Sequence, residues 1–267
     1  MRIAVAQQTS TPDTEANLQW MEARIAEAAT GGARLVAFPE NAPFMGPEAA
    51  RLAAPERADG PSMGRIAEAA RAHGIGVLVG SFAEAGPDAA HTYNTSLLFD
   101  ASGILVGSYR KMHLFDVTVS ADTIYRESAS VAAGEPTPVV VEFEGWRFGL
   151  SICYDLRFPE LYRKLVDQGA IALAIPAAFT MTTGKDHWHV LLRARAIEAQ
   201  SYVLAAAQTG KHSATRQSYG HALIVDPWGT VLAECGEGEG FAAAWVDTSV
   251  VERIRAGLPS LKHRRLG

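Results

Sequence analysis

Strand-like and helix-like segments alternate through both halves of the chain, and this alternation restricts the possible folds more than any other feature of the sequence. In the first half, short apolar segments at 2–7 and 34–39 flank a segment at 14–29 whose apolar residues recur at helical spacing. In the second half, an apolar segment at 146–152 precedes a helix-like segment at 159–168. Such alternation predicts an α/β fold with a mixed sheet.

The remaining segments continue the pattern and contain no linker or low-complexity stretch. Strands are also predicted at 75–82, 93–99, 104–110, 138–143, 171–175, 202–208, 222–225, 231–233 and 242–246, and helices at 62–73, 185–200 and 248–256. The segment 83–91 is typical of a turn, 41–61 of a loop, and 112–137 has no clean period. We therefore predict one domain over residues 1–267, with a core at about 1–247 and a C-terminal helix and tail at 248–267.

The amino-acid composition limits the partners and the cellular compartment that can be expected for the chain. Hydrophobic residues make up 48% of the chain, enough for a sizeable core, and the formal net charge of −5 gives no reason to expect nucleic acid or a membrane as a partner. Two cysteines cannot build a disulfide framework, and a reducing compartment is expected. Without a signal-like or membrane-spanning segment, we expect a cytoplasmic protein.

Cys153 stands where the predicted strand 146–152 ends and the chain turns towards a helix that Pro159 and Glu160 favour. Open α/β sheets place their chemistry at this position, and a thiol near a helix N-terminus has its thiolate form favoured. A free cysteine is just as often a small buried hydrophobe, so this stretch alone leaves the nucleophile and the core residue equally open.

Glu40 and Lys111 occupy the same kind of position as Cys153, since each follows the end of a predicted strand. If the strands are parallel neighbours, the three side chains converge at one edge of the sheet. A carboxylate can then take the proton of the thiol, and an ammonium can stabilise both the thiolate and the oxyanion of a tetrahedral intermediate. The trio suits attack on a carbon bonded to nitrogen through a thioester, although Glu40 alone could cap a helix and Lys111 alone could be a solvated charge.

Three motifs around these residues, Phe38–Glu40, Tyr109–Phe115 and Cys153–Glu160, resemble the signatures of the nitrilase superfamily of carbon–nitrogen hydrolases. The resemblance covers nearly the whole chain and continues through Pro176–Phe179, Thr183–Trp188, Leu192–Glu198, Ala207–Gly210, Ser218–Ala222 and Asp226–Gly229. It implies a single-domain, four-layer α-β-β-α sandwich with mixed sheets, a Glu–Lys–Cys triad, and homodimers or higher homo-oligomers that extend the sandwich across a helical interface. No cofactor is implied.

Within the superfamily the chain is most similar to the Nit branch, whose members are omega-amidases and deaminated-glutathione amidases. The resemblance implies an amidase of small linear carboxylated amides that releases ammonia through a cysteine thioester. Its substrate would be deaminated glutathione or an amide of the 2-oxoglutaramate type. A nitrilase or an N-carbamoyl amidohydrolase with the same fold and triad is the alternative, and a non-catalytic interaction protein is a more remote one.

Four further residues are candidates for the site. Glu127 occupies the place where the family often carries a second active-site glutamate, and a loop acid facing solvent is the alternative. Arg157 offers a planar fork for a carboxylate, and the resemblance assigns it the keto-acid end of the substrate. The N–H of Tyr154 is a natural oxyanion donor, and Phe179 matches a pocket wall of the family, although buried Phe is also common in cores.

A second chemical interpretation pairs the thiol with a histidine, either His113, His187 or His221, and needs neither Glu40 nor Lys111. His187 and a second histidine two residues later face different directions on the predicted helix, and no metal-binding motif occurs, so no metal site is predicted. Cys235 follows a strand in a Gly- and Glu-rich turn, and we predict that it has no catalytic role.

Overall fold

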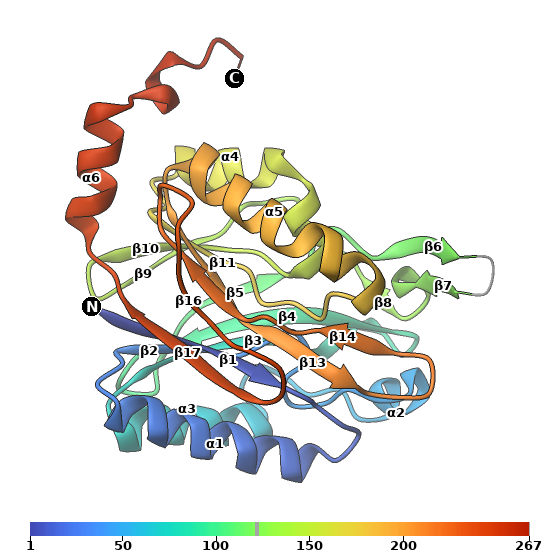
Figure 1. Ribbon diagram of the computed structural model, residues 1–267. Coiled ribbons are helices and arrows are strands. Elements are labelled where there is room, and N and C mark those ends of the chain that lie inside the picture. Colours follow the sequence, from blue (N-terminus) through green and yellow to red (C-terminus); the bar gives the residue numbers. More distant parts are fainter. Residues whose placement is uncertain (121–122, 267) are drawn as a thin grey trace.

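The computed structural model describes residues 1–120 and 123–266, whose strands form two large sheets and one small hairpin (Figure 1). The first sheet contains β1 (Arg2–Gln8), β2 (Leu35–Ala37), β3 (Gly76–Asp88), β4 (His91–Phe99), β5 (Leu105–Arg110), β8 (Val131–Ala132), β13 (Ala207–Lys211), β14 (Gln217–Tyr219) and β17 (Gly240–Trp245). The second contains β9 (Val140–Phe143), β10 (Trp146–Leu150), β11 (Ala172–Ala174), β12 (Tyr202–Ala205), β15 (Leu223–Val225) and β16 (Val231–Glu234). The hairpin is β6 (Asp116–Ser120) with β7 (Thr123–Arg126).

Both large sheets are mixed. In the first, β1 pairs in parallel with β2 and β13 and antiparallel with β17, and β2 pairs in parallel with β3. In the second, β10, β11 and β12 are parallel, whereas β9 and β15 run antiparallel to their neighbours. The mixed α/β fold predicted from the alternation is therefore confirmed.

Helices cover the outer faces of the two sheets. They are α1 (Thr14–Thr30), α2 (Glu48–Ala53), α3 (Pro61–His73), α4 (Pro159–Asp167), α5 (Met181–Ala199) and α6 (Thr248–Gly257), with short 3₁₀ turns η1 (Glu127–Ala129), η2 (Cys153–Arg157) and η3 (Ser260–His263). Figure 1 shows α1 and α3 below the first sheet and α4 and α5 above the second, which gives the four layers α-β-β-α that the resemblance implied. No helix in the described part of the chain is long and apolar enough to cross a membrane.

The layers pack around two apolar clusters. Leu18, Met21 and Ile25 of α1 are buried against the first sheet, because their spacing places them on one helical face. The side chain of Asp13 caps this helix by accepting from the N–H of Ala16 (3.0 Å). A larger cluster, which includes Leu150, fills the space between the two sheets and under α4 and α5.

Two predictions of strands and turns are corrected by the structure. The segment 202–208, predicted as one strand, is two: β12 lies in the second sheet, β13 in the first, and the chain crosses between the sheets at Ala206. An apolar run has the same pattern in either sheet, so its sequence cannot reveal this crossing. The predicted turn at 83–91 is mostly strand, because β3 and β4 continue as a long antiparallel ribbon to Asp88 and His91.

The loops contain more regular structure than predicted. The loop predicted at 41–61 contains α2, and the segment 112–137 contains β6, β7, η1 and β8. The helix predicted at 185–200 begins four residues earlier, at Met181, since the side chain of Thr180 caps it by accepting from the N–H of Thr183 (3.4 Å). These short elements are held by tertiary contacts and have no apolar periodicity of their own.

Candidate active site

Cys153 occupies a sharp turn directly after β10. It adopts a positive φ of 49°, a region that costs a non-glycine residue conformational energy and that often marks functional sites. Its N–H donates to the carbonyl of Pro176 (2.9 Å), which ties the turn to the segment after the neighbouring strand β11. The side chain is buried, 8% exposed, and borders a cavity.

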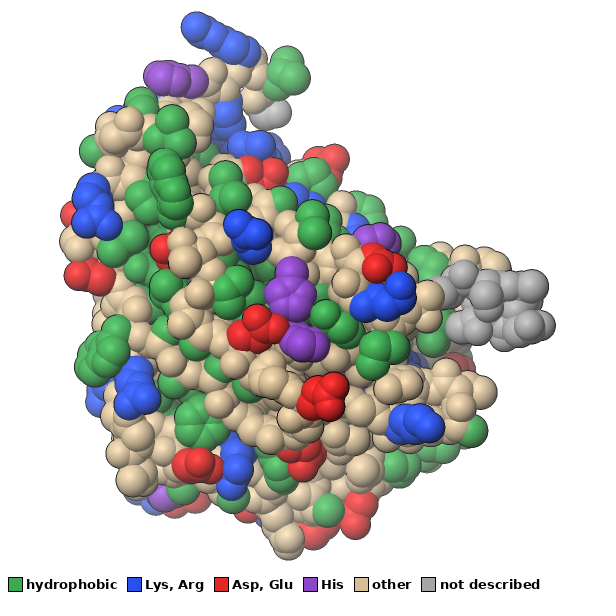
Figure 2. All heavy atoms as spheres, viewed as in Figure 1, with side chains coloured by type: hydrophobic (Ala, Val, Ile, Leu, Met, Phe, Trp, Pro, Cys, Tyr) green, Lys and Arg blue, Asp and Glu red, His purple; other side chains and the backbone are tan. Residues whose placement is uncertain are grey.

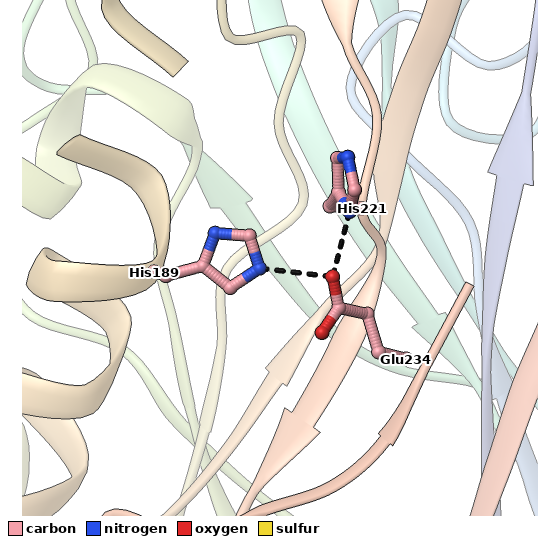
Figure 3. Close-up of side chains that lie close together, drawn as sticks. All are labelled: His189, His221 and Glu234. Carbon is pink, nitrogen blue, oxygen red and sulfur yellow. Dashed lines mark hydrogen bonds and ion pairs between the residues drawn. The ribbon is translucent and has the colours of Figure 1, made fainter. Parts of the chain in front are cut away.

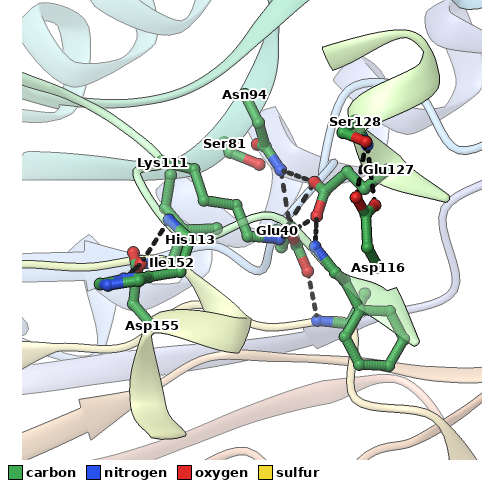
Figure 4. Close-up of polar contacts among 12 residues, drawn as sticks. Glu40, Ser81, Asn94, Lys111, His113, Asp116, Glu127, Ser128, Ile152 and Asp155 are labelled. Atoms are coloured by element: carbon green, nitrogen blue, oxygen red, sulfur yellow. Dashed lines mark hydrogen bonds and ion pairs between the residues drawn. The ribbon is translucent and has the colours of Figure 1, made fainter. Parts of the chain in front are cut away.

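Asp155 fixes this turn, and the sequence did not single it out. Its fully buried carboxylate accepts from the N–H of Ile152 (2.8 Å) and the hydroxyl of Tyr109 (2.7 Å) through Oδ2. Through Oδ1 it accepts from the N–H of His113 (3.2 Å) and contacts Nδ1 of the same residue (2.7 Å; Figure 4). One carboxylate thus links the nucleophile turn of the second sheet to the segment after β5 of the first.

Glu40 and Lys111 meet in the interior, as their positions at strand ends predicted. Nζ of Lys111 donates to Oε1 of Glu40 (2.9 Å), and both side chains are almost fully buried (Figure 4). Asn94 of β4 donates to the same oxygen (2.9 Å), while the N–H of Ala178 donates to Oε2 (2.9 Å). The Cys153 thiol borders the same cavity as Glu40 and Lys111, and the charges of both act on it, so the three predicted residues lie together.

Glu127 completes this group from η1. Its two oxygens accept from Nζ of Lys111 at 3.0 and 2.9 Å, and Oε2 also accepts from the N–H of Phe115 (2.7 Å). Its side chain is 14% exposed, so the alternative of a loop acid facing solvent is wrong. The ammonium of Lys111 therefore lies between the carboxylates of Glu40 and Glu127, which hold it beside the thiol.

The charges of this group favour a neutral thiol. Burial and the negative charge of Glu40 raise the pKa of the Cys153 thiol well above its ordinary value, against the opposing charge of Lys111. Burial alone would raise the pKa of Glu40, but the Lys111 ammonium outweighs burial and holds it below its ordinary value. Desolvation and the adjacent carboxylate thus outweigh the influence of Lys111 on the thiol, so Cys153 needs a base to take its proton.

Lys111 keeps its proton for the complementary reason. Burial alone would lower its pKa, but the carboxylates of Glu127 and Glu40 outweigh burial and raise it above the ordinary value. The resting site is thus an ammonium between two carboxylates beside a neutral thiol. This arrangement can deliver a proton from sulfur to Glu40 when an electrophile arrives, with a cation ready for the developing oxyanion.

A cavity of about 230 Å³ opens beside the thiol, and the predicted substrate-binding residues line it. Tyr154 packs edge-on against Phe115 (5.0 Å between ring centroids). The Phe179 ring packs against Trp188 (4.9 Å between ring centroids) and lies under the guanidinium of Arg157 (5.3 Å from the guanidinium carbon to the ring centroid). Phe179 is therefore both a wall of the cavity and part of the apolar core, the two alternatives predicted for it. Their roles towards a substrate stay predictions.

Arg157 lies at the mouth of this cavity, on the side that faces α5. Both of its terminal nitrogens are 3.3 Å from Nδ1 of His187, and its other contact is the face of Phe179. No carboxylate of the described residues lies within 4 Å of its guanidinium. The fork predicted to bind a substrate carboxylate is therefore held in position but is not occupied by an internal ion pair.

The histidines proposed as bases in the alternative Cys–His interpretation make contacts with other side chains. His113 contacts Asp155 and stacks on Phe158 (3.7 Å between centroids), and His187 contacts Arg157. His221 contacts Glu234 (2.6 Å) away from the cavity (Figure 3). None of these three is among the described residues that line the cavity, so the geometry favours Glu40 as the base.

His221, His189 and Glu234 bring three ligand-type atoms within 4.8 Å of one another, although the sequence predicts no metal site. Glu234 Oε1 contacts His189 Nε2 (2.9 Å) and His221 Nδ1 (2.6 Å), so hydrogen bonds within the cluster already satisfy these groups. Cys235, which follows, is buried, and burial raises its pKa to about 11. The predictions of no metal and of an inert Cys235 stay predictions.

Sequence reasoning missed several polar residues around the thiol. Besides Asp155 and Asn94, these are Arg51 of α2 and Arg216, which precedes β14, both of which line the cavity. Asp155 carried a detectable signal, because an acid two residues after a turn can cap a free N–H. The two arginines carried none, since each lies in a segment without predicted structure.

Comparison with known proteins matches this site to a family. A carbon–nitrogen hydrolase family model matches residues 2–256. The chain belongs to the carbon–nitrogen hydrolase family. This membership confirms the predicted enzyme class, a hydrolase of carbon–nitrogen bonds.

The chain is similar to proteins named deaminated glutathione amidase. It is 44% identical over 263 residues to the protein from Synechocystis sp., covering 98% of this chain and 97% of that relative. It is also 44% identical over 267 residues to the protein from Rattus norvegicus, covering 98% and 82%.

Solved structures show the same fold. The NitFhit protein of C. elegans superposes with a TM-score of 0.93 at 42% identity, over 99% of this chain and 65% of that longer chain. Nit3 of Saccharomyces cerevisiae, described as a member of branch 10 of the nitrilase superfamily, gives 0.89 at 32% identity, over 100% and 97%. An amidase from Nesterenkonia sp. AN1 gives 0.80 at 28%, over 97% and 98%, and carries acrylamide on its active-site cysteine.

Proposed function

We propose that this enzyme is an amidase of small linear carboxylated amides and that deaminated glutathione is its best substrate. The observation that carries the proposal is the buried group in which the Lys111 ammonium contacts Glu40 and the Cys153 thiol borders the same cavity. The 44% identity to two deaminated glutathione amidases, over 97% and 82% of their lengths, supports the choice of substrate.

The first half of the reaction forms a thioester. Glu40 takes the thiol proton as Cys153 Sγ bonds to the carbonyl carbon, which breaks the C=O π bond and places the electron pair on oxygen. Lys111 Nζ and the N–H of Tyr154 stabilise this oxyanion. When the carbonyl reforms, the C–N bond breaks and Glu40 returns the proton to the departing nitrogen.

The second half hydrolyses the thioester. Glu40 takes a proton from water as the water oxygen adds to the thioester carbon, and the same oxyanion donors stabilise the second intermediate. The C–S bond then breaks, the carboxylic acid leaves, and sulfur regains its proton. Glu127 supports both halves by holding Lys111 beside the thiol.

The nature of the leaving nitrogen depends on the substrate. A primary amide such as 2-oxoglutaramate releases ammonia, whereas deaminated glutathione releases the amine of a cysteinylglycine dipeptide. The predicted release of ammonia therefore applies only to primary amides. In both, the acyl half ends in a 2-oxo acid, whose carboxylate we assign to Arg157. An Arg fork binds a carboxylate bidentately, so Arg157→Lys should impair both substrates even though it keeps the charge.

A direct test measures both products from purified enzyme, ammonia from 2-oxoglutaramate and free amine from deaminated glutathione. The proposal expects turnover of both, a higher kcat/KM for deaminated glutathione, and no turnover by Cys153→Ala. Turnover of a matched nitrile or N-carbamoyl amine, without turnover of either amide, would favour the alternative enzyme. Absence of turnover of all four would favour the non-catalytic interpretation.

We also propose that the enzyme is a homodimer or higher homo-oligomer built through its α5 face. Val190 and Ile197 of α5 are 67% and 49% exposed, and Trp228 is 62% exposed next to Gly229, which lies against Ile197, so large apolar side chains gather on this face. Figure 2 shows hydrophobic side chains exposed on the face that carries α5 and α6. Light scattering should give at least twice the monomer mass, and Val190→Glu should lower it.

A cytoplasmic location remains the proposal for the compartment. Cys153 and Cys235 are both free thiols, as expected where thiols stay reduced. Fractionation of cells that express the tagged protein would test it, and recovery in a secreted fraction would contradict it.

A further inference from the structure

Two arginines on the Glu40 side of the cavity have guanidinium groups whose charge no described carboxylate neutralises. Arg51 donates to the hydroxyl of Ser130, but its Nε is buried and makes no hydrogen bond with any described residue. The Nε of Arg216 is in the same state. Neither guanidinium lies within 4 Å of a carboxylate in residues 1–120 and 123–266.

This arrangement is costly unless a ligand completes it. A buried donor without an acceptor loses its hydration without compensation, and two neighbouring cations repel each other. Burial, together with the charge of Arg216, lowers the pKa of Arg51, while Glu127 and Glu48 oppose this only in part. An anion placed against both guanidinium groups would satisfy the free donors and remove the repulsion.

The charge of the whole cavity indicates how many anions it takes. The described residues that line it include five cations and three carboxylates, although the complete chain has a net charge of −5. The cations are Arg51, Lys111, Arg126, Arg157 and Arg216, and the carboxylates are Glu40, Glu48 and Glu127. The excess of two positive charges matches a ligand with two carboxylates.

The two groups of arginines approach the thiol from different sheets. Arg157 follows β10 of the second sheet, whereas Arg51 and Arg216 belong to segments attached to the first, on α2 and before β14 (Figure 1). Arg157 is already assigned to the carboxylate of the acyl half. The second carboxylate, on the amine half, is therefore left to Arg51 and Arg216, which line the same cavity.

We infer that Arg51 and Arg216 form a second anion subsite, which binds a carboxylate on the amine half of the substrate. The inference rests on the proposed amidase function and narrows it to amides with a carboxylate on both sides of the scissile bond. The glycine carboxylate of deaminated glutathione is such a group, and the primary amide 2-oxoglutaramate lacks it. The subsite thus selects the substrate by its leaving group.

The test compares two substrates that differ in this carboxylate alone. One is deaminated glutathione, and the other is its C-terminal carboxamide, which has the same acyl half, scissile bond and dipeptide length. Leaving a buried charge without its partner typically costs enough to change kcat/KM about 30-fold or more. Wild type should therefore prefer the carboxylate by at least about 30-fold, mostly through KM.

Substitution should remove this preference selectively. Arg51→Met and Arg216→Met should each lower kcat/KM for the carboxylate substrate at least about tenfold and change the carboxamide and 2-oxoglutaramate little. Arg51→Lys, which keeps a charge, should retain part of the preference. Arg24→Met is the matched control, because its Nε also lacks a partner, yet it pairs with Glu27 on α1 outside the cavity.

The outcomes separate this inference from the function on which it rests. Equal kcat/KM for the two dipeptide substrates in wild type, or equal losses on both in the variants, would overturn the subsite and leave the amidase proposal intact. A preference lost in Arg157→Met but kept in Arg51→Met and Arg216→Met would assign the carboxylate to Arg157 and also overturn it. Failure of wild type on every amide would refute the proposed function itself.

Discussion

Asp155→Asn should damage stability and turnover together, because this carboxylate holds the turn that carries the thiol. The wild-type side chain accepts from Tyr109, Ile152 and the His113 backbone and contacts the His113 ring, all within 3.2 Å. Asparagine keeps one accepting oxygen and replaces the other by an NH₂ group. In either orientation this NH₂ group faces a backbone N–H, of Ile152 or of His113, so at least one of the four contacts is lost.

The structure sets the size of the effect. Each hydrogen bond to a charged acceptor contributes about 1.5–3 kcal/mol, so the free energy of unfolding should fall by at least about 1.5–3 kcal/mol. For a domain of this size that corresponds to a drop in Tm of at least about 3–12 °C. The Cys153 turn also loses its restraint, and a displacement of about 1 Å at a nucleophile can lower the rate roughly 100-fold.

Thermal unfolding by circular dichroism measures the first effect, and kcat at a temperature well below the variant's transition measures the second. Asp100→Asn is the control, since Asp100 Oδ1 accepts from the N–H groups of Ser102 (2.8 Å) and Ile104 (2.9 Å) in an exposed turn. Asparagine retains both bonds, so its change should stay within about 0.5 kcal/mol. A Tm within about 2 °C of wild type and an unchanged kcat for Asp155→Asn would refute the reasoning.

Three other predictions concern the reacting groups. Cys153→Ala should abolish turnover without unfolding, while Cys235→Ala should change kcat little; mass spectrometry of a stalled reaction should find the acyl adduct on Cys153, and an adduct on Cys235 would contradict this. Lys111→Met should lower kcat about 100-fold or more, as removal of an oxyanion donor does, and a near-wild-type rate would exclude that role. Because the pKa of Glu40 is lowered and those of Lys111 and Cys153 are raised, kcat/KM should stay flat from about pH 6 to 8 and fall only as acid protonates Glu40 below its ordinary range near 4.3. A limb between pH 6 and 8 would instead indicate a histidine base, and loss of activity on treatment with a chelator would contradict the absence of a metal.

The convergence of Glu40, Lys111 and Cys153 could be predicted because it depends on a general property of sheets, the placement of chemistry at strand ends. Glu127 could be placed only by resemblance, since nothing in the irregular segment around it shows that η1 turns its carboxylate inwards. The carboxylate of Asp155 contacts Tyr109 and His113, which lie more than 40 positions away in the sequence. The local sequence around Asp155 therefore indicates at most one of its contacts.

Other features depended on information that no local pattern contains. The division of 202–208 between two sheets depends on the pairing of β12 with β11 and of β13 with β1, which composition does not determine. The charges of Arg51 and Arg216 act on each other, although the two residues lie 165 positions apart in the sequence. The hydrophobic periodicity of a segment does not determine its long-range pairing with distant segments of this kind.

The position of β1 has a consequence for synthesis on the ribosome. β1 precedes every other strand of the described chain, but one of its edges pairs with β13 and with β17, which is the last strand to be translated. Until about residue 245 has emerged, the nascent chain carries an open strand edge with unpaired N–H and C=O groups. Such an edge invites pairing with other chains, so the nascent protein depends on protection from aggregation until its final strand closes the sheet.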